Sequence, residues 1–268
     1  MWKIYTEGMR IGFKVTIRSE NPSSLELVRM RLIDVVFYNH AITLLKRLSY
    51  TLGRRINSYK GLDGMSYKIV IGTDGVIEPQ PLNPDEKFVD EESSTNISAT
   101  IGDFWQWAYS DLISNTDRGI LAEYIVAIAL DIDDTVRVPW GPYDLVTPAG
   151  IKIEVKSGSY IQSWNQSEHS KIQFSIKKTL EWRPATNSFG GERKRQADIY
   201  VLCHLSHQTK KDINPLDLKQ WDFYVIPTNT LDIEMKDAGS ISLVRVKKFS
   251  EKYSFRQLKS ACDKACPK

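Results

Sequence analysis

The sequence predicts an α/β fold in which a central mixed β-sheet is flanked by helices. Short apolar or alternating runs are separated by segments of helical periodicity, a pattern that is typical of this class. The 268 residues are 41% hydrophobic and 26% charged, which are ordinary values for a globular protein with a sizeable core. The chain contains no run of 18 apolar residues and no signal-peptide pattern, so we expect a cytoplasmic protein without membrane spans.

The first hundred residues predict a separate α+β extension. Residues 1–17 alternate enough to form a hairpin, and residues 25–52 carry apolar side chains at helical spacing. Residues 79–97 are rich in Pro, Asp, Glu, Ser and Asn without periodicity, which is typical of a surface loop or linker. We therefore divide the chain into an N-terminal module, residues 1–99, and a core domain, residues 100–268.

A first core helix is predicted from Thr100 to about Leu112. Thr100 and Asp103 have the spacing of an N-cap residue and an acid in the first turn. The aromatic residues Phe104 and Trp107 lie at the spacing of a buried face, so we expect them to pack against the core.

The next predicted helix, Arg118–Leu130, is apolar on nearly every side and is expected to be buried. Glu123 is its only acid and has no partner on its own face, although an unpaired buried carboxylate is costly. Two interpretations remain open. Glu123 could form an ion pair with Arg137 or Arg118, or it could join a metal site.

The stretch from Tyr143 to Lys156 predicts a β-hairpin. Residues 151–156 alternate strictly between apolar and charged side chains, the pattern of a half-buried strand. Pro148, Ala149 and Gly150 suit a three-residue loop that ends in the left-handed region, where glycine is favoured.

This loop length fixes the register of the hairpin. Thr147 would lie opposite Ile151, and Asp144 would lie opposite Glu154. Lys156 shares that face, whereas the alternating apolar residues point into the core. A two-residue loop would place Asp144 on the other face, so the expected grouping depends on the turn.

Two carboxylates and one ammonium on the same face favour a metal site. Converging carboxylates repel each other unless a positive charge lies between them, and Mg²⁺ is bound by one or two carboxylates together with waters and phosphate oxygens. A neighbouring lysine can orient a water or stabilise charge on a phosphate. The alternative is that Glu154 and Lys156 form the solvent side of an amphipathic hairpin.

Asp144 and, ten positions later, Glu154-Val155-Lys156 resemble the signature of the PD-(D/E)XK nuclease superfamily. The resemblance implies a restriction-endonuclease-like core of order α-β-β-β-α-β. It implies that Asp144 and Glu154 ligate Mg²⁺, for which Mn²⁺ can substitute, that Lys156 positions or activates the attacking water, and that Glu123 joins the metal shell. The sequence departs from the family pattern at Pro142, which is separated from Asp144 by one residue.

Charge is unevenly distributed along the core domain. Residues 101–150 hold eight acidic and two basic side chains, whereas residues 151–268 hold 13 acidic and 21 basic ones. A basic surface beside an acidic ion-binding pocket suits a polyanionic substrate. Residues 177–196 are expected to form a flexible basic loop that contacts phosphates through Lys177, Lys178, Arg183, Arg193, Lys194 and Arg195, the alternative being an ordinary charged surface loop.

Gln162 follows Lys156 closely in the sequence. We therefore expect it to support the site residues from behind, for example by orienting Lys156. Further elements are predicted as strands at residues 171–176, 197–202, 223–226 and 241–246 and as a helix at residues 254–265.

These features and the resemblance together predict a Mg²⁺-dependent endonuclease that hydrolyses phosphodiester bonds. DNA is favoured over RNA as its substrate, and a restriction-type enzyme is one form it could take. The alternative is a nucleic-acid-binding protein that uses the same scaffold without cleaving. Residues 1–99 could read the nucleic-acid sequence or support a homodimer, and both roles remain open.

Overall fold

The computed structural model describes residues 3–7, 10–14, 29–31, 70–89 and 97–266. The chain divides into two compact units, Met1–Leu62 and Asp63–Lys268. None of the helices among the described residues is long and apolar enough to cross a membrane.

In the first unit, β1 (Lys3–Glu7) and β2 (Arg10–Lys14) form an antiparallel hairpin, as predicted. β3 (Arg29–Arg31) pairs with β2, so the helix prediction is wrong at these three residues. The remainder of that predicted helix lies outside the described residues.

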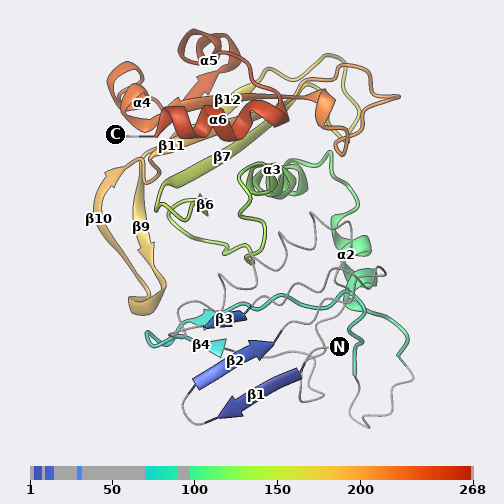
Figure 1. Cartoon of the computed structure of the whole chain (residues 1–268). Coiled ribbons are helices and arrows are strands. Elements are labelled where there is room, and N and C mark those ends of the chain that lie inside the picture. Colours follow the sequence, from blue (N-terminus) through green and yellow to red (C-terminus); the bar gives the residue numbers. More distant parts are fainter. Residues whose placement is uncertain (1–2, 8–9, 15–28, 32–69, 90–96, 267–268) are drawn as a thin grey trace, which may run out of the picture. The chain divides into compact units, whose positions relative to one another are not determined.

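The second unit contains both helices and strands (Figure 1). The elements are β4 (Val70–Ile71), β5 (Ile77–Glu78), α2 (Ile101–Tyr109), α3 (Asn115–Ala129), β6 (Leu145–Val146), β7 (Lys152–Ser159), β8 (Gln173–Ser175), β9 (Thr179–Arg183), η2 (Pro184–Thr186), β10 (Ser188–Lys194), β11 (Ile199–Leu205), η3 (Leu218–Gln220), β12 (Trp221–Pro227), α4 (Thr228–Glu234), β13 (Ser240–Ser242), α5 (Leu243–Phe249) and α6 (Phe255–Ala265).

The central sheet has four strands in the order β12-β11-β7-β6. β11 runs parallel to β7 and antiparallel to β12, and β6 runs antiparallel to β7, which confirms the mixed α/β fold. All seven residues of β11 are buried. In the described connections between β6 and β12 there is no α-helix, although the order α-β-β-β-α-β would place one before its last strand.

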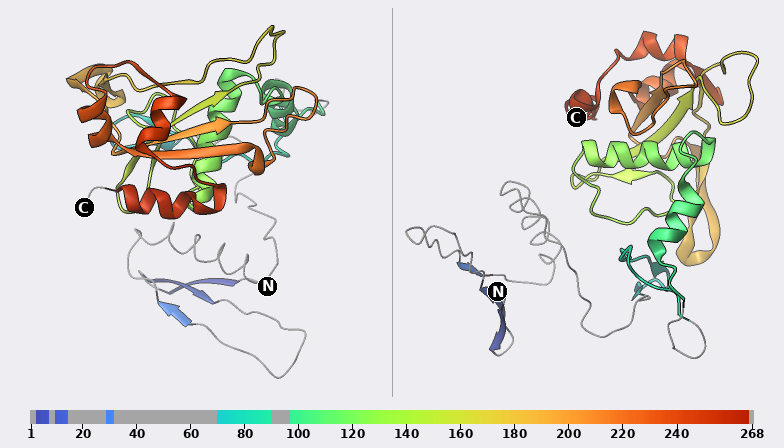
Figure 2. Two further views of the ribbon diagram at one scale, coloured as in Figure 1. Left: turned by 90° about the horizontal axis from the view of Figure 1, so that it is seen from above. Right: turned by 90° about the vertical axis from the view of Figure 1, so that its right-hand side faces the viewer.

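Helices cover both faces of this sheet because β11 and β12 are apolar on both sides. Ile153 and Val155 of β7 pack in one core cluster with residues of α3 and α6. Tyr200 and Leu202 of β11 pack in a second cluster with α4 and α5. Figure 2 shows α3 and α5 on opposite sides of the strands. The charged residues of β7 alternate with Ile153 and Val155, so they lie on the second face.

The helix starts follow the capping signals in the sequence. Thr100 forms a capping box with Asp103 at the start of α2, and the Ser114 hydroxyl accepts a hydrogen bond from the Asp117 N–H at the start of α3. The predicted burial of the aromatic face of α2 is wrong, since Trp107 is 84% exposed and no residue of this helix is buried.

The predicted strand at residues 241–246 is also only partly correct. Ser240–Ser242 pairs with β8 as the short strand β13, and α5 begins at the next residue. The Ser242 hydroxyl accepts a hydrogen bond from the Arg245 N–H, which satisfies one of the free amide groups at the start of α5. Local capping therefore decides the structure of this apolar segment.

A buried histidine should make folding stability depend on pH. The side chain of His204 in β11 is 3% exposed, its ring lies edge-on to that of Tyr160 at 4.7 Å, and burial lowers its pKa from 6.5 to about 4. In this range the unfolded chain binds a proton that the folded chain does not, so the free energy of unfolding falls by about 1.4 kcal/mol per pH unit as pH drops from 6.5 towards 4.

Urea unfolding of the wild type and of His204→Phe at pH 7.5 and pH 5 measures this dependence. We expect the loss of stability between pH 7.5 and pH 5 to be smaller in His204→Phe than in the wild type, because the variant lacks the buried imidazole. Equal losses in the wild type and in His204→Phe would contradict this account.

Candidate active site on the β6–β7 hairpin

The turn between β6 and β7 has the predicted conformation. Gly150 has a φ of +83°, in the left-handed region, and its N–H donates to the Thr147 carbonyl at 2.8 Å. The Thr147 N–H donates to the Ile151 carbonyl at 3.0 Å, and Leu145 lies opposite Ile153. The loop length and the register of the hairpin are therefore confirmed.

This register brings Asp144, Glu154 and Lys156 together. The Lys156 Nζ lies 2.6 Å from Glu154 Oε1 and 3.4 Å from Asp144 Oδ2. Asp144 Oδ2 also accepts a hydrogen bond of 2.7 Å from the Val155 N–H, which holds the carboxylate against β7. The three side chains are 20–30% exposed, so they are partly shielded but still reachable from solvent.

The electrostatics of the group reflect an excess of negative charge. Burial raises the pKa of Glu154, and the neighbouring carboxylates Asp144 and Glu123 raise it further against the opposing effect of Lys156. Burial acts to lower the pKa of Lys156, but Asp144 and Glu154 outweigh it and the pKa is raised. One ammonium group is therefore shared by two carboxylates.

Glu123 on α3 is held by Arg137, one of the two cation partners that the sequence leaves open. Arg137 Nε lies 2.5 Å from Glu123 Oε2, and Nη2 lies 2.9 Å from Oε1, so both carboxylate oxygens are engaged. Arg118, the other possible partner, instead donates to the Ile113 carbonyl and to Asn115. Glu123 stays within electrostatic reach of Glu154.

Tyr200 is a neighbour of the site that the sequence does not reveal. It lies opposite Glu154 in the parallel pairing of β11 with β7 and is 3% exposed. Burial raises its pKa, and the charge of Glu154 adds to this effect. A single tyrosine inside an apolar strand looks like an ordinary core residue, and only the pairing of β11 with β7 places it beside Glu154.

The donor set suits a hard divalent cation at Asp144 and Glu154. One oxygen of each carboxylate faces Lys156, and the other, Asp144 Oδ1 or Glu154 Oε2, accepts no hydrogen bond from the described part of the chain. Oxygen donors and surplus negative charge are what Mg²⁺ requires. Among the described residues no group of three or more His, Cys, Asp or Glu side chains is arranged to hold a metal, consistent with the engagement of Glu123 by Arg137.

Gln162 lies beyond the end of β7 and is 5% exposed. Its side-chain Nε2 donates to the Ser159 carbonyl at 3.0 Å and to the Ser170 hydroxyl at 3.2 Å. Its backbone N–H donates to Oε1 of Gln166. These contacts fold the loop after β7. The expected support of the active-site residues by Gln162 remains a prediction.

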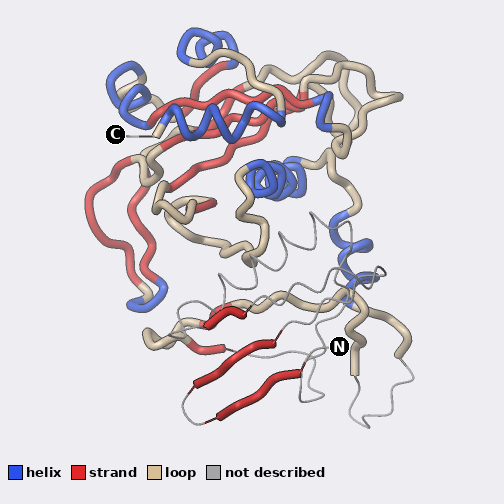
Figure 3. Tube along the Cα trace, viewed as in Figure 1, coloured by secondary structure: helices blue, strands red, loops and turns tan. Residues whose placement is uncertain are grey.

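The expected flexible basic loop is a β-hairpin instead. β9 and β10 pair antiparallel, with Arg183 opposite Ser188 next to the turn (Figure 3). The rings of Trp182 and Phe189, which lie opposite each other on the two strands, are 4.9 Å apart. Asn187, with a φ of +49°, closes the turn in the left-handed region. The loop prediction is wrong because the charged residues and glycines obscure a short alternating pattern, which aromatic cross-strand packing stabilises.

The six basic residues of this segment differ in their surroundings. Arg195 is buried with 0% of its side chain exposed, so it cannot contact a nucleic-acid phosphate in the folded chain. Lys178 lies 2.8 Å from Asp237, and Arg183 pairs with Glu181. Lys194, together with Lys177 and Arg193, is exposed to solvent.

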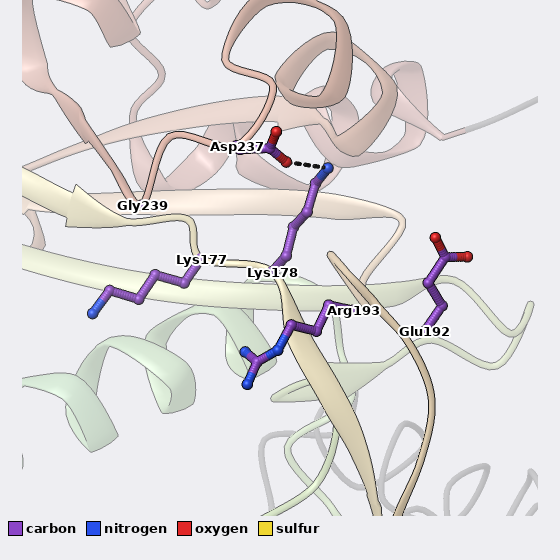
Figure 4. A pocket seen from close by; sticks show the side chains of 6 residues that line it. All are labelled: Lys177, Lys178, Glu192, Arg193, Asp237 and Gly239. Atoms are coloured by element: carbon purple, nitrogen blue, oxygen red, sulfur yellow. Dashed lines mark hydrogen bonds and ion pairs between the residues drawn. The ribbon is translucent and has the colours of Figure 1, made fainter.

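Lys177, Lys178 and Arg193 line an open pocket of about 420 Å³ with Glu192, Asp237 and Gly239 (Figure 4). Figure 4 shows Lys178 directed at Asp237, whereas Lys177 and Arg193 point away from that carboxylate. Lys177 and Arg193 therefore present their charges to solvent beside the Lys178–Asp237 ion pair.

Comparison with known families gives one finding about identity. Residues 84–244 match the model of the family described as bacteriophage T4 endonuclease IV, and this range includes Glu123, Asp144, Glu154 and Lys156. Comparison with curated proteins and with solved structures gave no match. Since the matched range covers more than half of the chain, the chain belongs to the bacteriophage T4 endonuclease IV family, and the protein is an endonuclease.

Proposed function

We propose that this protein is a Mg²⁺-dependent endonuclease that hydrolyses phosphodiester bonds in DNA and that its active site is the β6–β7 hairpin. The observation that carries the proposal is the convergence of Asp144 and Glu154 on Lys156 at distances of 3.4 and 2.6 Å. Membership of an endonuclease family independently supports the reaction class. The resemblance of the three residues to the PD-(D/E)XK signature supports the choice of site.

Asp144 and Glu154 would hold the ion through their carboxylate oxygens. A bound Mg²⁺ would supply positive charge to the phosphate and its leaving oxygen. Lys156, whose ammonium lies beside both carboxylates, would orient the attacking water by hydrogen bonding. Glu123 adds negative charge to the site, and its two oxygens are engaged by Arg137.

The exposed cations of residues 177–194 would bind the phosphate backbone of the substrate. Lys177, Arg193 and Lys194 are exposed to solvent, and positive side chains of this kind contribute to affinity for phosphate irrespective of base sequence. Lys178 and Arg183 would join them by exchanging their acidic partners Asp237 and Glu181 for phosphate. Arg195 takes no part in this surface.

The proposal is tested with supercoiled plasmid, circular single-stranded DNA and RNA, each incubated with the protein in Mg²⁺, Mn²⁺ or EDTA. We expect cleavage of DNA in either metal and none in EDTA. Discrete fragments would indicate a restriction-type preference for particular sites, whereas a smear would indicate its absence.

Three results would overturn parts of the proposal. Cleavage that persists in EDTA would contradict the metal requirement, and cleavage of RNA alone would contradict the assignment of DNA as the substrate. Binding of DNA without cleavage would identify the non-cutting alternative.

A further inference from the structure

We propose that Arg137 contacts a phosphate of the substrate at the active site and that Glu123 is its positioning residue. This inference rests on the proposed function and adds a residue that the nuclease signature does not contain. In this proposal Glu123 orients the guanidinium group of Arg137.

The geometry of the pair fixes the plane of the guanidinium. Arg137 lies in the connection between α3 and β6, and its Nε and Nη2 bond the two oxygens of Glu123 at 2.5 and 2.9 Å. Two parallel bonds of this kind hold an arginine in one orientation. Glu123 in turn is fixed by α3, which packs against β7. The guanidinium is therefore attached to the rigid core although Arg137 lies in a loop.

Exposure shows which side of the pair faces solvent. The Glu123 side chain is 12% exposed, whereas the Arg137 side chain is 41% exposed. Within the described residues Arg137 Nη1 donates no hydrogen bond, so its two N–H groups remain available. Half-exposed ion pairs contribute little to stability, and this one leaves part of a preorganised donor group at the surface.

The path of the chain brings these donors towards the proposed site, because Arg137 lies in the connection that leads from α3 to Asp144 and β6, and its partner Glu123 lies on α3, which packs against β7. The electrostatics agree with this placement. The pKa of Arg137 is raised first by its hydrogen bond to Glu123, and Asp144 contributes through space, so the guanidinium lies within electrostatic reach of the catalytic hairpin. Glu123, Asp144 and Glu154 give three carboxylates against the two cations Arg137 and Lys156. A phosphate approaching this surplus of negative charge needs a cation on its path. A guanidinium with free donors matches the oxygens of a phosphate.

The test compares steady-state cleavage of a DNA oligonucleotide by the wild type, Arg137→Ala, Arg137→Lys and Glu123→Gln. We expect Arg137→Ala to lower kcat/KM by about a hundredfold, as loss of one preorganised donor does. Arg137→Lys should recover little, since an ammonium lacks the planar arrangement of donors. Glu123→Gln should cause a smaller loss. Methylguanidinium added to Arg137→Ala should restore part of kcat, a response that a purely structural role would not give.

A matched control is Arg245→Ala, which removes an exposed arginine bonded to the Glu234 carbonyl. It should keep wild-type kinetics and should not respond to methylguanidinium. Wild-type kcat/KM in Arg137→Ala, or a loss that methylguanidinium does not relieve, would overturn the inference.

DNA binding in Ca²⁺ without turnover separates failure of the inference from failure of the proposed function. The slope of log K against log[salt] should be less steep by about 0.9 for Arg137→Ala than for the wild type, because one phosphate contact is lost. An unchanged slope overturns the inference even if the wild type cleaves. If the slope for Arg137→Ala differs from that of the wild type but the wild type does not cleave DNA, the phosphate contact is supported and the nuclease reaction is rejected. Absence of any DNA binding rejects both.

Discussion

Replacement of Lys156 by alanine, or of Glu154 by glutamine, is expected to lower the rate of DNA cleavage by about a thousandfold, within the range that single catalytic groups contribute. Lys156 Nζ lies 2.6 Å from Glu154 Oε1, so each substitution removes one partner of this ion pair. Glu154→Gln keeps the volume of the side chain but removes the charge that would hold the ion. The measurement is a single-turnover cleavage rate in saturating Mg²⁺.

Lys152→Ala provides the control for these variants. Lys152 belongs to the same strand, is exposed, and lies over the Tyr143 ring at 5.6 Å rather than beside the carboxylates. It should cleave at close to the wild-type rate. Circular dichroism and urea unfolding should show a folded protein in all three variants. Cleavage by Lys156→Ala or Glu154→Gln at the Lys152→Ala rate would rule out the hairpin as the active site.

Replacement of Arg195 by methionine is expected to destabilise the protein by roughly 3 kcal/mol, because it leaves buried acceptors without a donor. The Arg195 guanidinium donates to the carbonyl oxygens of Ile176, Lys236 and Ala238 and to Asp232. It thus ties the end of β10 to the segment after α4. Urea unfolding monitored by tryptophan fluorescence measures the loss.

Two further substitutions separate burial from charge. Lys194→Met removes a neighbouring cation whose side chain is exposed, and its stability should stay within about 0.5 kcal/mol of the wild type. Asp232→Asn should cost less than Arg195→Met, since the Asp232 side chain is 46% exposed and the three carbonyl contacts remain. Equal stability of the two variants at positions 194 and 195 would contradict this interpretation.

The hairpin could be predicted from the sequence because its signals are local. Strict alternation from Ile151 to Lys156 defines the two faces of β7, and Gly150 defines the turn, so the grouping of the charged residues follows from the chain itself. The helix around Glu123 is similarly evident from its apolar composition. Both strands of the buried pair β11 and β12 also follow from continuous apolar runs.

Features that depend on tertiary contacts could not be predicted in this way. Nothing in the sequence distinguishes Arg195 from the adjacent Lys194, and only the surrounding fold buries the former. The sequence leaves Arg137 and Arg118 as equal partners for Glu123, and the path of the chain after α3 selects Arg137. Trp107 is exposed because no element among the described residues covers α2. An amphipathic pattern predicts a helix with an apolar face, but it does not indicate whether another element packs on that face.

The parallel pairing of β7 with β11 means that the proposed active site forms completely or not at all. Tyr200 is paired with Glu154 and Leu202 with Lys156, between two layers of buried side chains. A slip of β7 by one residue would turn both charged groups into the apolar layer beneath α3 and expel Ile153 and Val155. Partial misalignment is therefore too unfavourable to persist. A destabilised variant would lose activity by having fewer folded molecules, each of which keeps an intact site.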